Sequence, residues 1–266
     1  MAAMSFLTDN APPPKPAEPE RAQRELDMWR QNAAARSSDE PDLAKFMTEF
    51  AACEEGRLFL EAIFGNSPFL SQGLRHNPAL LQKTANQGFD QAFEDLLKTL
   101  VGEKLWQRGR PEVMSGLRLA KRSAALAIAL ADIAGAWPLE KVCQSLSRFA
   151  EISISIALNF LLCQAAKNGQ MSLANPENPE SGCGIVVLGM GKLGANELNY
   201  SSDIDLLVLF DGEVVDYAGD DGPQQGLHRM VRELVVIMGE RSADGYVFRT
   251  DMRLRPDPSS TPLAVS

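Results

Sequence analysis

The chain of 266 residues contains only two histidines and four cysteines. The cysteines are widely spaced, and no two of them are separated by only two residues. A zinc site or a disulfide framework needs closely spaced ligands or paired cysteines, so neither is indicated. Because chains without disulfides are typical of reducing compartments, we expect a cytoplasmic protein.

An excess of positive charge is also missing, since the formal net charge is -9. Nucleic-acid-binding surfaces show a basic patch or stripe, so the composition argues against a nucleic-acid partner. No run of about 18 consecutive apolar residues occurs, and the N-terminus lacks the apolar core of a signal peptide. The sequence therefore predicts neither a membrane span nor export.

Two aspartates stand at the start of a predicted strand. Residues 185–210 read as strand, glycine turn, short helix and strand, and Asp203 and Asp205 open the last of these. In a strand, residues i and i+2 point to the same face, about 6.6 Å apart. Carboxylates placed in this way are suited to hard cations such as Mg2+. The opposite face of the strand is wholly apolar and consists of Ile204, Leu206, Val208 and Phe210.

The glycine turn before this strand supports a competing interpretation. Residues 189–194, GMGKLG, match the pattern G-x-G-x-x-G of NAD-binding Rossmann folds, and Asp211 falls about where a ribose-binding acid belongs. However, only eight residues separate Gly194 from Asp203. A crossover between parallel strands usually needs a dozen or more residues, and the strands of such a sheet are normally apolar on both faces. The metal-binding interpretation is therefore favoured.

A third acid lies in a second predicted strand, residues 247–255, where residue types alternate without a break. Two metal ions need more than two carboxylates, and a neighbouring strand can supply the third. Asp251 is that candidate; the alternative is a surface strand with alternating salt bridges. Arg249, Arg253 and Arg255 share the face of Asp251 and are candidates for bidentate bonds to phosphate.

The glycine turn also predicts a phosphate site. Glycines let a phosphate approach the backbone closely, and a helix N-terminus supplies free amides. Lys192 adds a cation, whereas the two serines before the strand either donate hydroxyl hydrogen bonds or simply form a turn. The predicted phosphate- or nucleotide-binding residues are Gly189, Gly191, Lys192, Gly194, Ser201, Ser202 and Arg253.

The predicted fold class is α+β, with a helical N-terminal region followed by a mixed-sheet core. Residues 21–169 repeat apolar side chains at spacings of three and four, which predicts successive helices. Residues 1–20 are rich in proline and are expected to be a disordered lead-in. The polar segment 170–182 is the predicted linker. The core, residues 183–266, is expected to be incomplete at its C-terminus, with residues 263–265 pairing with structure beyond the chain.

Two longer motifs resemble one particular family. Residues 189–211, GMGKLGANELNYSSDIDLLVLFD, and residues 248–256, FRTDMRLRP, are similar to the bifunctional glutamine synthetase adenylyltransferases and adenylyl-removing enzymes. This family belongs to the nucleotidyltransferase superfamily that includes DNA polymerase beta. The resemblance implies a polymerase-beta-like core in which Asp203, Asp205 and Asp251 are catalytic and hold Mg2+.

The residues of the first motif and its position in the chain resemble those of the first of the family's two nucleotidyltransferase domains. The resemblance therefore implies a truncated N-terminal, adenylyl-removing part. The implied reaction is Mg2+-dependent phosphorolysis of AMP from a tyrosine of glutamine synthetase, within an enzyme that also adenylylates from ATP. The implied partners are glutamine synthetase, ATP or ADP, phosphate and a PII-type regulatory protein.

Two alternatives stay open. The chain is a catalytically inactive module that senses nucleotide or binds a partner, or it is the NAD-binding domain considered above. Because all three acids are present, the sequence gives no sign of a decayed site.

Overall fold

The structure is a computed structural model that describes residues 12–254 and 263–265. It comprises two compact units. The units are Met1–Leu97 with Arg122–Val142, and Lys98–Lys121 with Cys143–Ser266. The predicted linker at residues 170–182 is not one of these division points, and the domain organisation stays a prediction.

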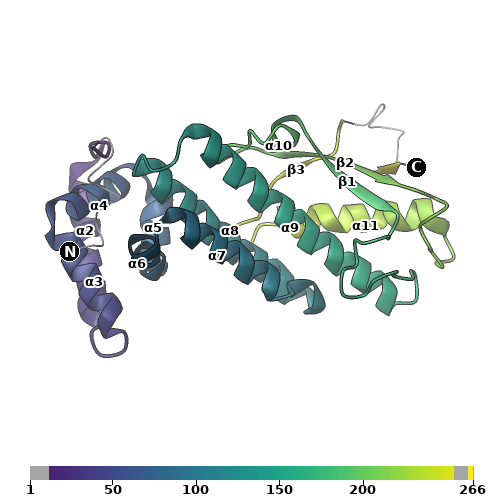
Figure 1. Ribbon diagram of the computed structural model, residues 1–266, viewed down its shortest axis with the longest axis horizontal. Helices are drawn as coiled ribbons and strands as arrows, with labels where there is room; N and C mark the ends of the chain where they lie inside the picture. The colour runs from purple at the N-terminus through teal and green to yellow at the C-terminus, as the bar shows by residue number, and fades with distance from the viewer. Residues whose placement is uncertain (1–11, 255–262, 266) are drawn as a thin grey trace. The chain divides into compact units, whose positions relative to one another are not determined.

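Helices occupy the range where a helical region is predicted (Figure 1). They are α2 (Pro19–Ala35), α3 (Pro41–Ala52), α4 (Glu54–Asn66), α5 (Pro68–His76), α6 (Pro78–Gln87), α7 (Phe89–Gly102), the 3-10 turn η2 (Leu105–Gln107), α8 (Arg110–Ile133) and α9 (Leu139–Lys167). Their boundaries follow local chemistry. Ser67 and Asn77 cap α5 and α6 by accepting backbone amides, and Gly88 ends α6 with a positive φ of 84°.

The core of the first unit forms where α2, α3 and α4 pack side by side. Trp29 is fully buried, its ring centroid lies 6.2 Å from that of Phe64, and its Nε1 donates to the Met47 carbonyl at 3.0 Å. The lead-in ends against α4, since the amides of Ala17 and Glu18 donate to Asn66 and Gly65. The expectation of disorder through residue 20 is therefore wrong for this part; residues 1–11 lie outside the described residues.

The second unit contains a mixed sheet, which confirms the predicted α+β class. Its described strands are β1 (Ile185–Met190), β2 (Ile204–Phe210), β3 (Thr250–Asp251) and β4 (Ala264–Val265). Strand β2 pairs antiparallel with β1 and parallel with both β3 and β4. The antiparallel pairing removes the support for an NAD-binding Rossmann domain, which needs a parallel crossover between those two strands. Pairing of β4 with β2 also corrects the expectation that residues 263–265 pair outside the chain.

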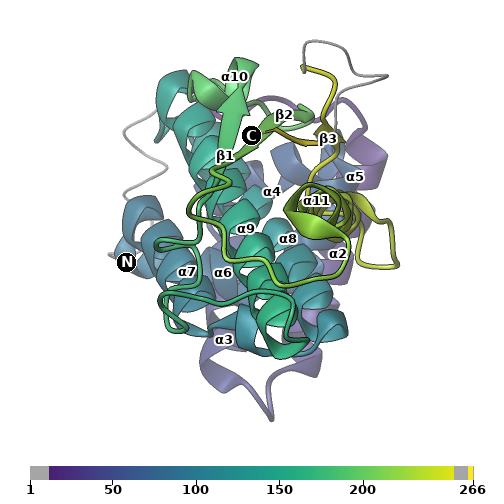
Figure 2. The ribbon, with the colours of Figure 1, turned by 90° about the vertical axis from the view of Figure 1, so that its right-hand side faces the viewer.

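Helix α11 (Gly222–Gly239) covers one face of this sheet (Figure 2). Every second residue of β2 is buried, as the sequence pattern predicts. Leu227, Val231 and Leu234 of α11 meet Val187 and Val208 of the sheet around a small apolar cavity of about 10 Å³. The face that α11 leaves uncovered is the one to which Asp205 points.

The strand predicted over residues 247–255 is much shorter in the structure. Only Thr250 and Asp251 pair with β2, and residues 252–254 form no ladder. The amides of Val247 and Phe248 donate to the Met238 carbonyl instead, and residue 255 lies outside the described residues. Backbone amides bonded elsewhere cannot join a ladder, so the alternation of residue types overstated the strand.

The segment 170–182 is a docked connection without a helix. Its Glu180 carboxylate accepts hydrogen bonds from Ser155 at 2.5 Å and Asn159 at 2.9 Å, both on α9. Burial raises the pKa of Glu180.

Among the described residues, α9 alone is long and apolar enough to cross a membrane, but 67% of its most apolar window is buried, as in the core helix of a soluble protein.

One buried hydroxyl connects α9 to the segment that leads into β2. The Ser147 Oγ accepts the amide of buried Leu198 at 3.2 Å. Ser147→Ala leaves this amide unpaired, and we expect a loss of about 1–3 kcal/mol in the free energy of unfolding. Urea denaturation measures it.

Ser153→Ala is the matched control. Ser153 is equally buried on the same helix and donates to the carbonyl four residues earlier, as Ser147 also does, but its hydroxyl accepts no amide in the described residues. A loss below about 1 kcal/mol is expected. Equal losses in the two variants would show that the Leu198 amide does not depend on Ser147.

Candidate active site

Three predicted acids meet at one end of the sheet. Asp205 is opposite Asp251 in the parallel pairing of β2 with β3, and Asp203 precedes Asp205 by two residues. Partners in adjacent parallel strands lie about 4.8 Å apart and point to the same face. The pairing therefore assembles the acids from two segments separated by some 45 residues of sequence.

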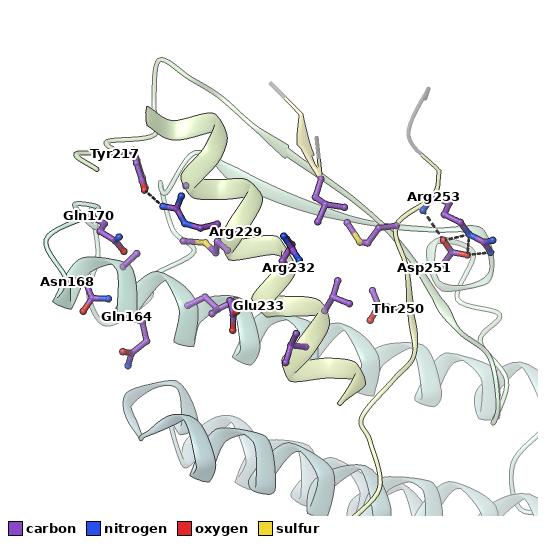
Figure 3. A pocket seen from close by; sticks show the side chains of 18 of the residues that line it. Gln164, Asn168, Gln170, Tyr217, Arg229, Arg232, Glu233, Thr250, Asp251 and Arg253 are labelled. Atoms are coloured by element: carbon purple, nitrogen blue, oxygen red, sulfur yellow. Dashed lines mark hydrogen bonds and ion pairs between the residues drawn. The ribbon is translucent and has the colours of Figure 1, made fainter. Parts of the chain in front are cut away.

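Arginines hold two of these carboxylates. Arg249 pairs with Asp203 through Nε and also donates to the Ser201 carbonyl at 2.8 Å and the Tyr246 hydroxyl at 3.3 Å. Arg253 binds Asp251 through Nε, at 3.0 Å to Oδ1 and 2.9 Å to Oδ2, and through Nη2, at 2.5 Å to Oδ2. The Arg253 amide adds a bond of 2.8 Å to Oδ1 (Figure 3).

The electrostatics of the site follow from these pairs. The side-chain and backbone hydrogen bonds from Arg253 hold the pKa of Asp251 below its ordinary value. The pKa of Arg253 is raised first by its bonds to Asp251, and then by the charges of Asp251, Asp205 and Asp203. One guanidinium thus lies within electrostatic reach of all three carboxylates.

The donor chemistry fits a divalent cation such as Mg2+, which takes oxygen ligands. The Arg253 guanidinium bonds one of the three carboxylates, that of Asp251, and lies within electrostatic reach of the other two. Yet no group of three acidic, histidine or cysteine side chains in the described residues converges closely enough to hold one metal ion. Arg249 and Arg253 occupy carboxylate oxygens that such a cation would use.

The glycine turn approaches the acids closely. Gly191 has a φ of 53°, and a Cβ added there would lie 2.9 Å from the Asp205 Oδ2. A Cβ on Gly194 would lie 2.4 Å from the Gly189 carbonyl oxygen. The turn continues into α10 (Gly191–Gly194), which is only four residues long, so its helix dipole is small.

The other residues that are predicted to bind phosphate differ in their surroundings. Lys192 is exposed, and no described residue forms a hydrogen bond or ion pair with its ammonium group. Ser202 donates from its hydroxyl to Asn199 Oδ1 at 2.5 Å, which is the turn-forming alternative. Ser201 offers its carbonyl to Arg249. The phosphate roles of all these residues stay predictions.

A groove of about 1000 Å³ begins at Asp203, Asp251 and Arg253 and runs between α9 and α11 (Figure 3). At its far end Tyr217 donates to Asp221 at 3.0 Å and accepts from Arg229 at 3.2 Å. This groove was not predicted from the sequence. Its one sequence signal is Gly226 in α11, where a Cβ would lie 2.1 Å from the Tyr217 ring.

A mixed sheet with one aspartate just before β2, one on β2 and one on the neighbouring β3 is the arrangement expected of a nucleotidyltransferase domain. The family model described as glutamate-ammonia ligase adenylyltransferase matches residues 59–266, and the chain belongs to this family. The family resemblance seen in the two sequence motifs is thereby confirmed.

Relatives carry the same description. A bifunctional glutamine synthetase adenylyltransferase/adenylyl-removing enzyme of Bradyrhizobium diazoefficiens is 41% identical over 244 residues, which are 88% of this chain and 24% of the relative. One of Bartonella henselae is 43% identical over 210 residues, 78% of this chain and 21% of the relative. The chain spans about a quarter of the length of these curated relatives.

The close contact at Gly191 generates a prediction. In Gly191→Ala the left-handed backbone costs roughly 1–2 kcal/mol, and the new methyl group also displaces the Asp205 carboxylate. Gly169→Ala is the control, because Gly169 has a similar φ of 69° but nothing within 4 Å of its Cβ position.

Urea denaturation should show a larger loss of unfolding free energy for Gly191→Ala, by about 0.5–1.5 kcal/mol, the cost of turning the Asp205 side chain away from its rotamer. If both variants lose the same amount, the turn does not press on Asp205.

Proposed function

We propose that this chain provides a nucleotidyltransferase site that removes AMP from an adenylylated tyrosine of glutamine synthetase by Mg2+-dependent phosphorolysis. The observation that carries the proposal is the pairing of Asp205 with Asp251, beside Asp203, on the open face of the sheet. The names of the relatives support glutamine synthetase as the protein substrate.

The proposed reaction is an in-line displacement at one phosphorus atom. An oxygen of inorganic phosphate attacks the phosphorus of adenylyl-tyrosine, the bond to the tyrosine oxygen breaks, and ADP forms. The tyrosine oxygen takes up a proton, which the attacking hydrogen phosphate releases. When bound, Mg2+ supplies charge stabilisation to the phosphoryl oxygens.

Residues of the chain bind and orient the reactants. Asp203, Asp205 and Asp251 hold the cation, and the glycine turn with Lys192 offers amides and a positive charge to the attacking phosphate. Arg253 is the arginine beside the acids with the more exposed side chain, 82% against 54% for Arg249. It therefore has more freedom to turn toward a phosphoryl oxygen.

The same apparatus would serve the opposite reaction, in which tyrosine attacks ATP. Adenylyl removal is favoured because the first motif resembles the first of the family's two nucleotidyltransferase domains. ADP, ATP and a PII-type regulatory protein are the further partners that we propose, in a cytoplasmic setting.

Asp203→Asn and Asp205→Asn, each made in the complete bifunctional enzyme, test the metal ligands. Each removes a charge at constant volume, so phosphorolysis should fall by more than about a hundredfold while the fold persists. Release of ADP from adenylylated glutamine synthetase in the presence of phosphate is the measurement.

Asp211→Asn is the matched control, because Asp211 follows the other end of β2 and its carboxylate caps a turn through the Glu213 amide at 2.9 Å. This variant should retain activity. Near-normal turnover of both Asp203→Asn and Asp205→Asn would refute the metal assignment.

The direction of transfer is tested with Asp205→Asn in the full-length enzyme by following both reactions. We expect release of ADP to stop while adenylylation from ATP continues. Continued release with lost adenylylation would mean that this site adds AMP. Retention of both reactions would favour the inactive binding module.

A further inference from the structure

The two arginines beside the acids engage their carboxylates differently. Arg249 bonds only Oδ1 of Asp203, among the atoms that the structure describes, and leaves Oδ2 without a partner. Arg253 and its amide occupy both Oδ1 and Oδ2 of Asp251. A cation can therefore reach Asp203 while Arg249 stays in place, but it cannot reach Asp251 unless the Arg253 side chain leaves.

The two arginine side chains also differ in how many other groups hold them in place. The Arg249 guanidinium is also held by the Ser201 carbonyl and the Tyr246 hydroxyl, and its own carbonyl accepts the Ile204 amide at 2.9 Å. It thus connects the entry of β2 to the segment before β3. The hydrogen bonds that the structure gives the Arg253 side chain all go to Asp251, and this side chain is 82% exposed.

We infer that Arg249 is a positioning residue that orients Asp203 for a divalent cation, and that Arg253 is a displaceable counter-cation that leaves Asp251 when that cation binds. This inference rests on the proposed metal-dependent function. The released guanidinium then faces the substrate, where its planar fork suits two phosphoryl oxygens. Binding of the cation and release of a phosphate ligand are coupled.

Binding of Mn2+ alone to this chain tests the inference, measured by calorimetry and by electron paramagnetic resonance. Arg253→Gln removes the competitor, so Mn2+ should bind about two- to fivefold more tightly, the range that an exposed ion pair can contribute. Arg249→Gln removes the same charge but also the orientation of Asp203, so Mn2+ should bind more weakly. Arg249→Lys, which keeps the charge but not the planar fork, should bind more weakly too.

Arg241→Gln is the matched control. Arg241 lies over the ring of Tyr246, the tyrosine that Arg249 also bonds, with its guanidinium carbon 5.5 Å from the ring centroid. None of its described contacts is with the three acids. Its loss should leave Mn2+ affinity unchanged. Opposite shifts for Arg253→Gln and Arg249→Gln support the inference, because a simple charge effect has the same sign in both.

Nitrogen-15 spectra of the arginine Nε–H groups provide a second measurement. Titration with Mg2+ should shift the Arg253 signal strongly, because it loses its carboxylate, and leave that of Arg249 nearly in place. Tighter Mn2+ binding in both arginine variants, or an unmoved Arg253 signal, overturns the inference while leaving the proposed function intact. Failure of the wild-type chain to bind Mn2+ overturns both.

Discussion

The parallel pairing of β2 with β3 is the constraint on which the candidate site depends. It consists of only two residue pairs, Ile204 with Thr250 and Asp205 with Asp251. Without it the third acid would lie on an unrelated segment. The pairing is supported from behind by α11, whose apolar residues cover the other face of the sheet, and by the Ile204 amide bonded to the Arg249 carbonyl.

Gathering carboxylates in this way has an electrostatic cost, since like charges close together disfavour ionisation. Two arginines from the β3 segment offset that cost locally, Arg249 at Asp203 and Arg253 at Asp251. The arrangement favours a ligand that brings positive charge, which is what metal-assisted phosphoryl transfer requires.

Much of this organisation was readable from the sequence. Alternation in β2 correctly predicted that Ile204, Leu206, Val208 and Phe210 are buried. Short spacing between Gly194 and Asp203 correctly disfavoured a parallel crossover. In both cases local geometry determines the outcome, because the period of a strand and the reach of eight residues leave few alternatives.

Other features depend on contacts that no local pattern encodes. The strand over 247–255 was overestimated because the Met238 carbonyl takes two of its amides. The pairing of Arg249 with Asp203, and the groove that ends at Tyr217, arise between segments far apart in sequence. The expected disorder through residue 20 failed for the same reason, since Ala17 and Glu18 bond to the end of α4.

We propose that Asp203, Asp205 and Asp251 bind one metal ion together. The most direct measurement is anomalous diffraction from crystals of the chain soaked with Mn2+. An anomalous peak is expected within about 2.0–2.4 Å of oxygens from all three aspartates, the range of divalent cation–oxygen bonds. A peak elsewhere, with Arg253 still bound to Asp251 in crystals saturated with Mn2+, would contradict it.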